Sequence, residues 1–200
     1  KLVHTAIGTL VDLNRAGMPL IEIVGEPDLR APAEAHAFLS HLRELLRHAG
    51  VGDCDLELGS MRCDANISLM PIGSTVYGTK VELKNLNSLK MVQRALEYEE
   101  RRQTAVLAAG GRIQPETRSW HDELGESRPM RSKENAPDYR YLGDPDLPPL
   151  TIDAALLERE RAAMGELPDQ RRERYRREFG LAEHDVEALV RDREVGEWFE

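Results

Sequence analysis

The feature that most constrains the fold is an alternating run between residues 61 and 69. Apolar or small residues occupy its odd positions, whereas Arg62, Asp64, Asn66 and Ser68 occupy the even ones. This period of two predicts a β-strand with one face on an apolar core. Alternate strand residues lie about 6.5–7 Å apart, so the other face carries a cation, a carboxylate, an amide and a hydroxyl in one row.

A second alternating run, residues 80–84, ends beside a predicted helix at residues 88–109. The lysines at both ends of this run share one face with Glu82 between them. Backbone N–H groups at a helix N-terminus attract anions. The charged row and the helix start together predict a place that holds an anion.

The rest of the chain predicts short strands and helices. Periodicity and turn residues predict strands at residues 10–14, 20–24 and 53–58 and on both sides of a turn at 122–125, and helices at 32–48, 153–164, 168–179 and 183–193. Strand signals end near residue 150. We therefore expect an α+β fold, with a mixed or antiparallel sheet packed by helices in residues 1–152, followed by an all-α segment in residues 153–200.

Two carboxylates are distinctive because of their predicted surroundings. Glu22 lies inside an apolar run; if that strand is buried on both faces, Glu22 must be paired, protonated or metal-bound, and the alternative is a strand end that points to solvent. Glu57 lies on a predicted hairpin partner of the strand at 61–69. It would then approach Arg62 or Asp64, which gives either a divalent-cation site or an ordinary Glu57–Arg62 ion pair.

The predicted helix at residues 168–179 is rich in arginine. Arg171, Arg172 and Arg174 could follow the phosphates of a nucleic acid. Glu173 lies among these arginines and lowers the net positive charge of the helix. An ordinary solvated helix face therefore explains the composition equally well. Polar residues of two further helices are expected at the surface. Glu99 belongs to the charged side of the helix at 88–109. The histidines of the helix at 32–48, His48 among them, lack the spacing of metal ligands and are expected to be surface residues.

Composition excludes several classes of protein. No run approaches the roughly 18 apolar residues of a membrane helix, so we expect no membrane partner. The net charge is −9, which argues against a chain coated for non-specific nucleic-acid binding. Two cysteines without a C-x-x-C pattern fit a reducing cytoplasm. The phosphate-binding loop, dinucleotide fingerprint and zinc-protease motifs do not occur.

Several long motifs closely resemble the B-subunit family of the glutamyl/aspartyl-tRNA amidotransferases. They are VDLNRAGMPLIEIV from residue 11, GSMRCDANIS from residue 59, ELKNLNS from residue 82, GGRIQPETR from residue 110 and DYRY from residue 138. The resemblance covers essentially the whole chain. It implies the later part of an α/β cradle domain and the start of a helical domain, so we expect a fragment of a longer subunit.

The resemblance also implies an activity. Such a protein works in the cytoplasm with an amidase (A) subunit and a small C subunit on misacylated tRNA. It uses ATP and Mg²⁺ to phosphorylate the side-chain carboxylate of Glu-tRNA(Gln) or Asp-tRNA(Asn). Ammonia from the amidase partner then gives Gln-tRNA or Asn-tRNA. The alternatives are a non-catalytic tRNA-binding or adaptor module, and the archaeal E-type amidotransferase chain that serves Glu-tRNA alone.

Site residues follow from the resemblance together with the predicted strand faces. Glu22 is similar to a family metal ligand, Asp64 is the next candidate ligand, and Glu57 is the third, with Leu58 where the family usually has a second glutamate. Lys84 is placed to hold phosphate as a point charge. Further candidates are Arg62, Asn66, Lys80, Asn85 and Asn87 for substrate or phosphate, with a helix cap as the favoured role of Asn87, and Asp146 for an ammonia path.

Overall fold

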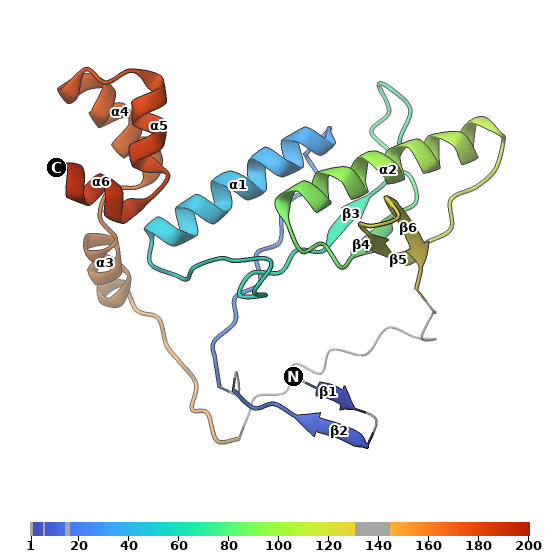
Figure 1. The fold of residues 1–200 in the computed structure, drawn as a ribbon, viewed down its shortest axis with the longest axis horizontal. Helices are drawn as coiled ribbons and strands as arrows, with labels where there is room; N and C mark the ends of the chain where they lie inside the picture. The colour runs from blue at the N-terminus through green and yellow to red at the C-terminus, as the bar shows by residue number, and fades with distance from the viewer. Residues whose placement is uncertain (1, 6, 15–16, 131–144) are drawn as a thin grey trace.

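The computed structural model describes residues 2–5, 7–14, 17–130 and 145–200 (Figure 1). A four-stranded sheet has the order β3-β4-β5-β6. Its strands are β3 Ala65–Ile67, β4 Val81–Lys84, β5 Glu116–His121 and β6 Glu126–Pro129. The outer pairs are antiparallel and the central pair β4–β5 is parallel, so the expectation of an α+β fold with a mixed sheet is confirmed.

Helix α2, Leu89–Ala108, makes the crossover that the parallel pair requires. Its buried Val92, Ala95 and Leu96 cluster with Leu83 of β4 and Trp120 of β5, so this helix covers one face of the sheet. The helix begins where the Ser88 hydroxyl accepts a hydrogen bond from the Met91 N–H. The helix thus forms where its apolar periodicity and an N-cap residue predict it, and the cap is Ser88 rather than Asn87.

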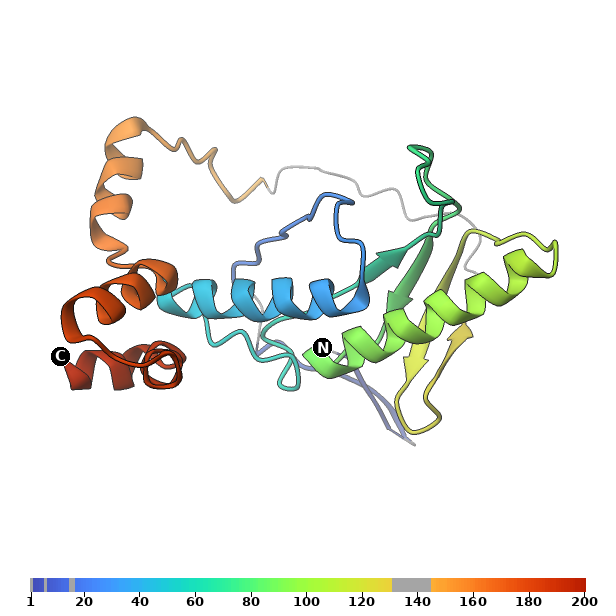
Figure 2. The same ribbon diagram turned by 90° about the horizontal axis from the view of Figure 1, so that it is seen from above.

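Helix α1, Pro32–His48, starts at a proline as predicted. Ala35 and Leu39, in its first half, pack against the same core as α2. In Figures 1 and 2, α1 runs from the side of α2 toward the C-terminal helices. It therefore touches both halves of the described chain.

Two of the expected strands, at residues 20–24 and 53–58, do not form. Residues 20–24 form no strand, and Leu20 and Val24 are 91% and 82% exposed. The strand expected there rests on hydrophobicity alone. Of the strand expected at 10–14, only residues 10 and 11 belong to β2 Gly8–Val11, which pairs with β1 Leu2–Thr5 as a separate antiparallel hairpin.

The predicted strand at 53–58 is a turn, because the Asp55 side chain accepts a hydrogen bond from the Leu58 N–H at 2.8 Å and the Asp55 carbonyl accepts one from Met61. The hairpin with residues 61–69 therefore does not form. Within that alternating run only Ala65–Ile67 is strand, and its partner is β4.

The C-terminal part is helical, as predicted: α3 Ala154–Ala163, α4 Pro168–Phe179, α5 Glu183–Val190 and α6 Arg193–Phe199. The helix expected at 183–193 splits in two because Asp192 caps α6, accepting hydrogen bonds from two backbone N–H groups. Tyr175, Val186 and Val190 form a second buried cluster. None of the helices among the described residues is long and apolar enough to cross a membrane.

Candidate functional site

The polar face of the sheet brings three charged side chains together. The β3–β4 register pairs Ala65 with Leu83, which sets the preceding Asp64 opposite the following Lys84. Lys84 Nζ lies 3.0 Å from Asp64 Oδ2 and 3.3 Å from Glu82 Oε1. Thr117 of β5 donates a hydrogen bond of 2.7 Å to the other Glu82 oxygen. The row of polar groups predicted along two strands is thus one connected group across three strands.

Contacts within the group favour the charged forms of Lys84 and Glu82. The hydrogen bond to Asp64 raises the pKa of Lys84 above its ordinary value. Partial burial alone would raise the pKa of Glu82, but hydrogen bonds from Thr117 and Lys84 outweigh it and hold that pKa below its usual range. The side chains of Asp64, Lys84 and Glu82 are 51%, 39% and 33% exposed. A ligand from solvent can therefore reach them.

Lys84 is the group best placed to bind an oxyanion. It ends β4, as expected, and an ammonium group has three N–H donors. Two of them are directed at Asp64 and Glu82. The flanking carboxylates hold the ammonium in place and charged, and the third donor can serve a phosphate oxygen.

Three other predicted binding residues are exposed near this group. Asn66 lies on β3 directly opposite Glu82, whereas Arg62 and Lys80 lie just before β3 and β4. The described residues show no Glu57–Arg62 ion pair, because Glu57 is exposed in the turn that replaces the expected strand. A cation site or ion pair built on Glu57 and that hairpin is therefore not formed.

Asn85 contacts both the sheet and Asn87. Asn85 adopts a positive φ of 65°, a conformation that asparagine tolerates better than most residues. Its Nδ2 donates to the Trp120 carbonyl at 2.9 Å, and its Oδ1 accepts from Asn87 Nδ2 at 3.4 Å. These amides fix the end of β4 against β5. The favoured role of Asn87 as helix cap is wrong, since Ser88 is the cap.

The described residues do not by themselves form a magnesium site. Glu22 is exposed on an irregular segment, so the expectation of a buried carboxylate is wrong and the solvent-facing alternative agrees better with the structure. Among the described residues, no three His, Cys, Asp or Glu side chains lie close enough together to hold a metal ion. Asp64 and Glu82 share the ammonium of Lys84, whose single positive charge offsets one of their two negative charges.

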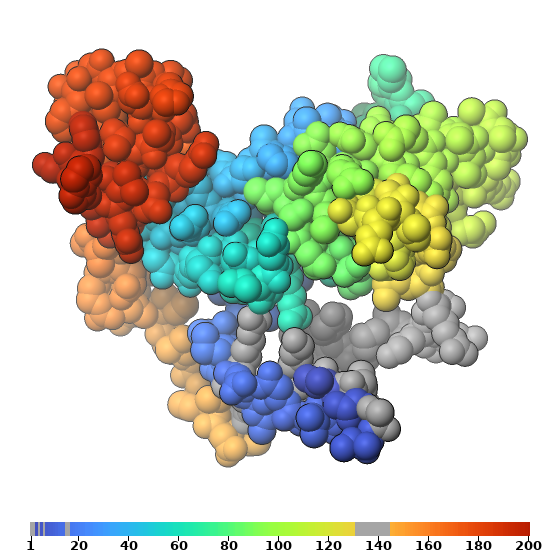
Figure 3. Space-filling view, in the orientation of Figure 1, coloured from blue at the N-terminus to red at the C-terminus, as the bar shows by residue number. Residues whose placement is uncertain are grey.

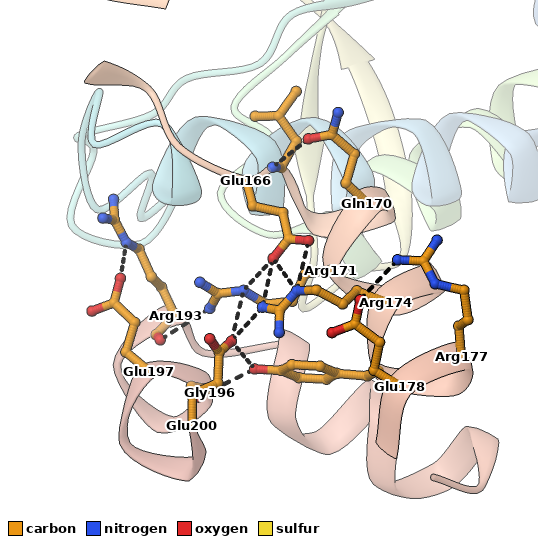
Figure 4. A network of polar contacts seen from close by, with 12 residues as sticks. Glu166, Gln170, Arg171, Arg174, Arg177, Glu178, Arg193, Gly196, Glu197 and Glu200 are labelled. Atoms are coloured by element: carbon orange, nitrogen blue, oxygen red, sulfur yellow. Dashed lines mark hydrogen bonds and ion pairs between the residues drawn. The ribbon is translucent and has the colours of Figure 1, made fainter. Parts of the chain in front are cut away.

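The arginines of α4 do not form a free basic surface. Arg174 forms a bidentate pair with Glu166 and also binds Glu200 at 2.6 Å (Figure 4). Arg171 lies 3.6 Å from Glu166 and is 8% exposed. Arg172 binds carboxylates of α1 and α5. These three residues therefore form neither a free basic face nor a solvated one, because carboxylates of the same chain pair with them. A contact between them and tRNA stays a prediction.

Sequence reasoning missed a buried polar network between α2 and the sheet. Glu99 was expected on a charged surface, yet it is fully buried. It accepts hydrogen bonds from Arg102, from Gln103 at 3.2 Å and from Ser127 at 3.1 Å, and Arg118 lies 3.6 Å away. The sequence offers one signal for this network, the alternation within the predicted strands at 112–131. Arg118 lies two positions before the buried Trp120, so both side chains share the core face of β5. Counting charged residues does not reveal this.

Asp146 is exposed in the segment that precedes α3. Its proposed place on an ammonia path stays a prediction. The motif DYRY at residues 138–141 lies outside the described residues.

Comparison with known proteins gives consistent matches. The family described as the GatB/GatE catalytic domain matches residues 1–158. The B subunit of the aspartyl/glutamyl-tRNA(Asn/Gln) amidotransferase from Anaeromyxobacter sp. (strain Fw109-5) is 52% identical over 202 residues. The proteins of the same name from Symbiobacterium thermophilum and Bacillus velezensis are also 52% identical. Each match covers 100% of this chain and 42% of the relative, so the chain spans less than half the length of these proteins.

Proposed function

Because the chain belongs to the GatB/GatE catalytic-domain family, we propose that it carries the phosphate-binding face of a tRNA-dependent amidotransferase. The whole protein would convert Glu-tRNA(Gln) and Asp-tRNA(Asn) to Gln-tRNA and Asn-tRNA. It would act in the cytoplasm with an amidase (A) subunit and a small C subunit. The relatives are each named as the B subunit of such an enzyme, which supports an assembly of several chains.

In the proposed reaction the side-chain carboxylate on the tRNA attacks the γ-phosphorus of ATP, and the bond to ADP breaks. Ammonia, released from glutamine by the amidase partner, attacks the carbonyl carbon of the acyl phosphate. Phosphate leaves with the electron pair of the broken C–O bond, and a proton is lost from nitrogen. This chemistry needs positioning and charge stabilisation rather than a nucleophilic side chain.

The observation that supports this function is the position of Lys84. Its ammonium lies between Asp64 and Glu82 on a half-exposed sheet face inside the matched domain. A lysine held and charged in this way can stabilise the phosphate oxygens through both steps. Mg²⁺, when bound, would screen the same phosphates, with Asp64 and Glu22 as the proposed ligands. The described residues supply no complete ligand set.

The test uses the full-length protein assembled with its partners. We would measure ATP-dependent amidation of Glu-tRNA(Gln) and, separately, tRNA binding, for Glu22→Gln and Asp64→Asn. Glu123→Gln, on the exposed β5–β6 turn, is the matched control. We expect both test variants to bind tRNA and lose amidation while the control keeps it. Near-normal amidation by both would move the chemistry away from these carboxylates and favour the non-catalytic binding module.

A further inference from the structure

The C-terminal helices have their own core and meet the rest of the chain at α1. In the described part of the chain, the cluster of Tyr175, Val186 and Val190 shares no residue with the cluster around the sheet. Figure 3 shows the C-terminal helices gathered at one end of the molecule, with α1 between them and α2. We call α4–α6 the helical unit. Its helices follow the matched domain, which ends at residue 158.

One arginine joins the helical unit to α1. Arg172 of α4 uses Nη2 to reach both oxygens of Glu44 on α1, at 2.8 and 2.9 Å. It also forms a bidentate pair with Glu187 of α5, at 2.7 Å from Nε and 3.0 Å from Nη2. The side chains of Arg172 and Glu44 are each 15% exposed. Its Nη1 donates to a third carboxylate, Asp169 of α4, at 3.0 Å. A shielded guanidinium shared by three carboxylates is far more directional than a surface ion pair.

The neighbouring contacts between α1 and the helical unit are polar as well. The buried His48, which was expected at the surface, places Nε2 2.8 Å from the Val190 carbonyl. The carbonyl of His48 accepts a hydrogen bond of 2.9 Å from Arg193. His41 Nε2 lies 3.4 Å from Asp169. Hydrogen bonds and ion pairs define an orientation more sharply than apolar contact does, because each depends on angle as well as distance.

From this geometry we infer that Glu44 and Arg172 are positioning residues that fix the orientation of the helical unit on the catalytic domain, and thereby the productive placement of the tRNA. The inference rests on the proposed function. A tRNA is much larger than a four-stranded sheet, so a substrate whose acceptor end reaches Lys84 must extend past the sheet. The helical unit lies at the far end of α1 from the sheet (Figure 2), where its orientation limits the path of that substrate.

The test compares Glu44→Gln, Arg172→Gln and the double variant in the full-length assembled complex. Arg177→Gln is the matched control, since Arg177 lies on the same helix, is 65% exposed and pairs only with neighbouring Glu178 among the described residues. We expect KM for Glu-tRNA(Gln) to rise about fivefold in each single variant, with kcat within twofold. Because the two residues act as one pair, the double variant should be no worse than the worse single variant. Arg172→Lys should restore part of the affinity for tRNA, since lysine keeps the positive charge but lacks the paired N–H donors of the guanidinium.

Hydrogen exchange on the same complexes supplies a readout that does not depend on activity. Amides of α4 and α5 should exchange about tenfold faster in Glu44→Gln than in Arg177→Gln, while those of α2 are unchanged. The inference is overturned if Glu44→Gln matches the Arg177→Gln control in both KM and exchange, or if kcat falls and KM does not. Absence of ATP-dependent amidation in the unaltered complex would instead refute the proposed function, and exchange alone would then decide whether the pair fixes the helical unit.

Discussion

Replacing Lys84 with methionine removes the ammonium from the sheet face while keeping most of the side-chain volume. Lys84 makes two ion pairs, at 3.0 Å with Asp64 and 3.3 Å with Glu82. In each pair, the side chain of at least one partner is more than one-third exposed. Exposed ion pairs contribute about 0.2–1 kcal/mol each to stability. We therefore expect the free energy of unfolding to fall by only about 1 kcal/mol.

The effect on ligand binding should be much larger. A hydrogen bond to a charged group contributes about 1.5–3 kcal/mol. Each 1.36 kcal/mol is a factor of ten, so losing one contact from Lys84 to a phosphate oxygen raises KM for ATP about ten- to hundredfold. The contrast between a small stability loss and a large binding loss separates a functional lysine from a structural one.

The assay measures ATP-dependent amidation and urea unfolding of the full-length protein side by side. Lys90→Met is the control, because Lys90 is exposed on α2 and lies close in the chain. The reasoning is refuted if Lys84→Met leaves KM for ATP unchanged. It is equally refuted if the free energy of unfolding falls by more than about 3 kcal/mol, since the lysine would then be structural.

Three further predictions concern stability of the full-length protein. Glu99→Gln should destabilise it by about 2 kcal/mol in urea unfolding, because the hydrogen bond from Arg102 to a buried carboxylate is lost, whereas exposed Glu100→Gln should change little. The loss stays moderate because Glu116 still pairs with Arg102 and Arg118. Ser88→Ala should cost about 1 kcal/mol by removing the α2 cap, and Asn87→Ala much less; the reverse order would restore Asn87 as the cap. Burial raises the pKa of Glu99, but hydrogen bonds from Arg102 outweigh it, so the folded pKa lies below the unfolded one. That stabilisation is complete above the unfolded pKa and is lost as pH falls through the folded value, so urea midpoints should drop as the pH falls below the ordinary glutamate value of 4.5. Midpoints that rise on acidification would contradict this.

Local signals were enough for the elements that contain their own stop and start residues. Pro32 starts α1, Ser88 caps α2, and Gly180 ends α4 in a left-handed conformation with φ 62°. The alternation of residues 80–84 predicted β4 and the face that carries Lys84. Each of these features depends on residues within one turn or one strand, which a sequence pattern records directly.

Hydrophobicity without periodicity predicts the wrong element at residues 20–24. An apolar run favours a buried strand only where another layer covers it, and in the described residues Leu20 and Val24 stay exposed. The same missing information placed Glu22 in a core. The turn at Asp55 was missed for a different reason, since a side-chain hydrogen bond to the backbone competes with the strand.

The sequence by itself determined helices α1, α2 and α4, the polar strand face with Lys84 and the family resemblance, because these depend on spacing along the chain. Only the tertiary structure decided which charges meet. Arg172 and Glu44 lie 128 positions apart, and Glu99 meets Ser127 only because α2 packs across the sheet. Ion pairs act over a few ångströms in space whatever their separation in sequence, so the composition of an arginine-rich helix does not reveal that Arg172 joins it to α1.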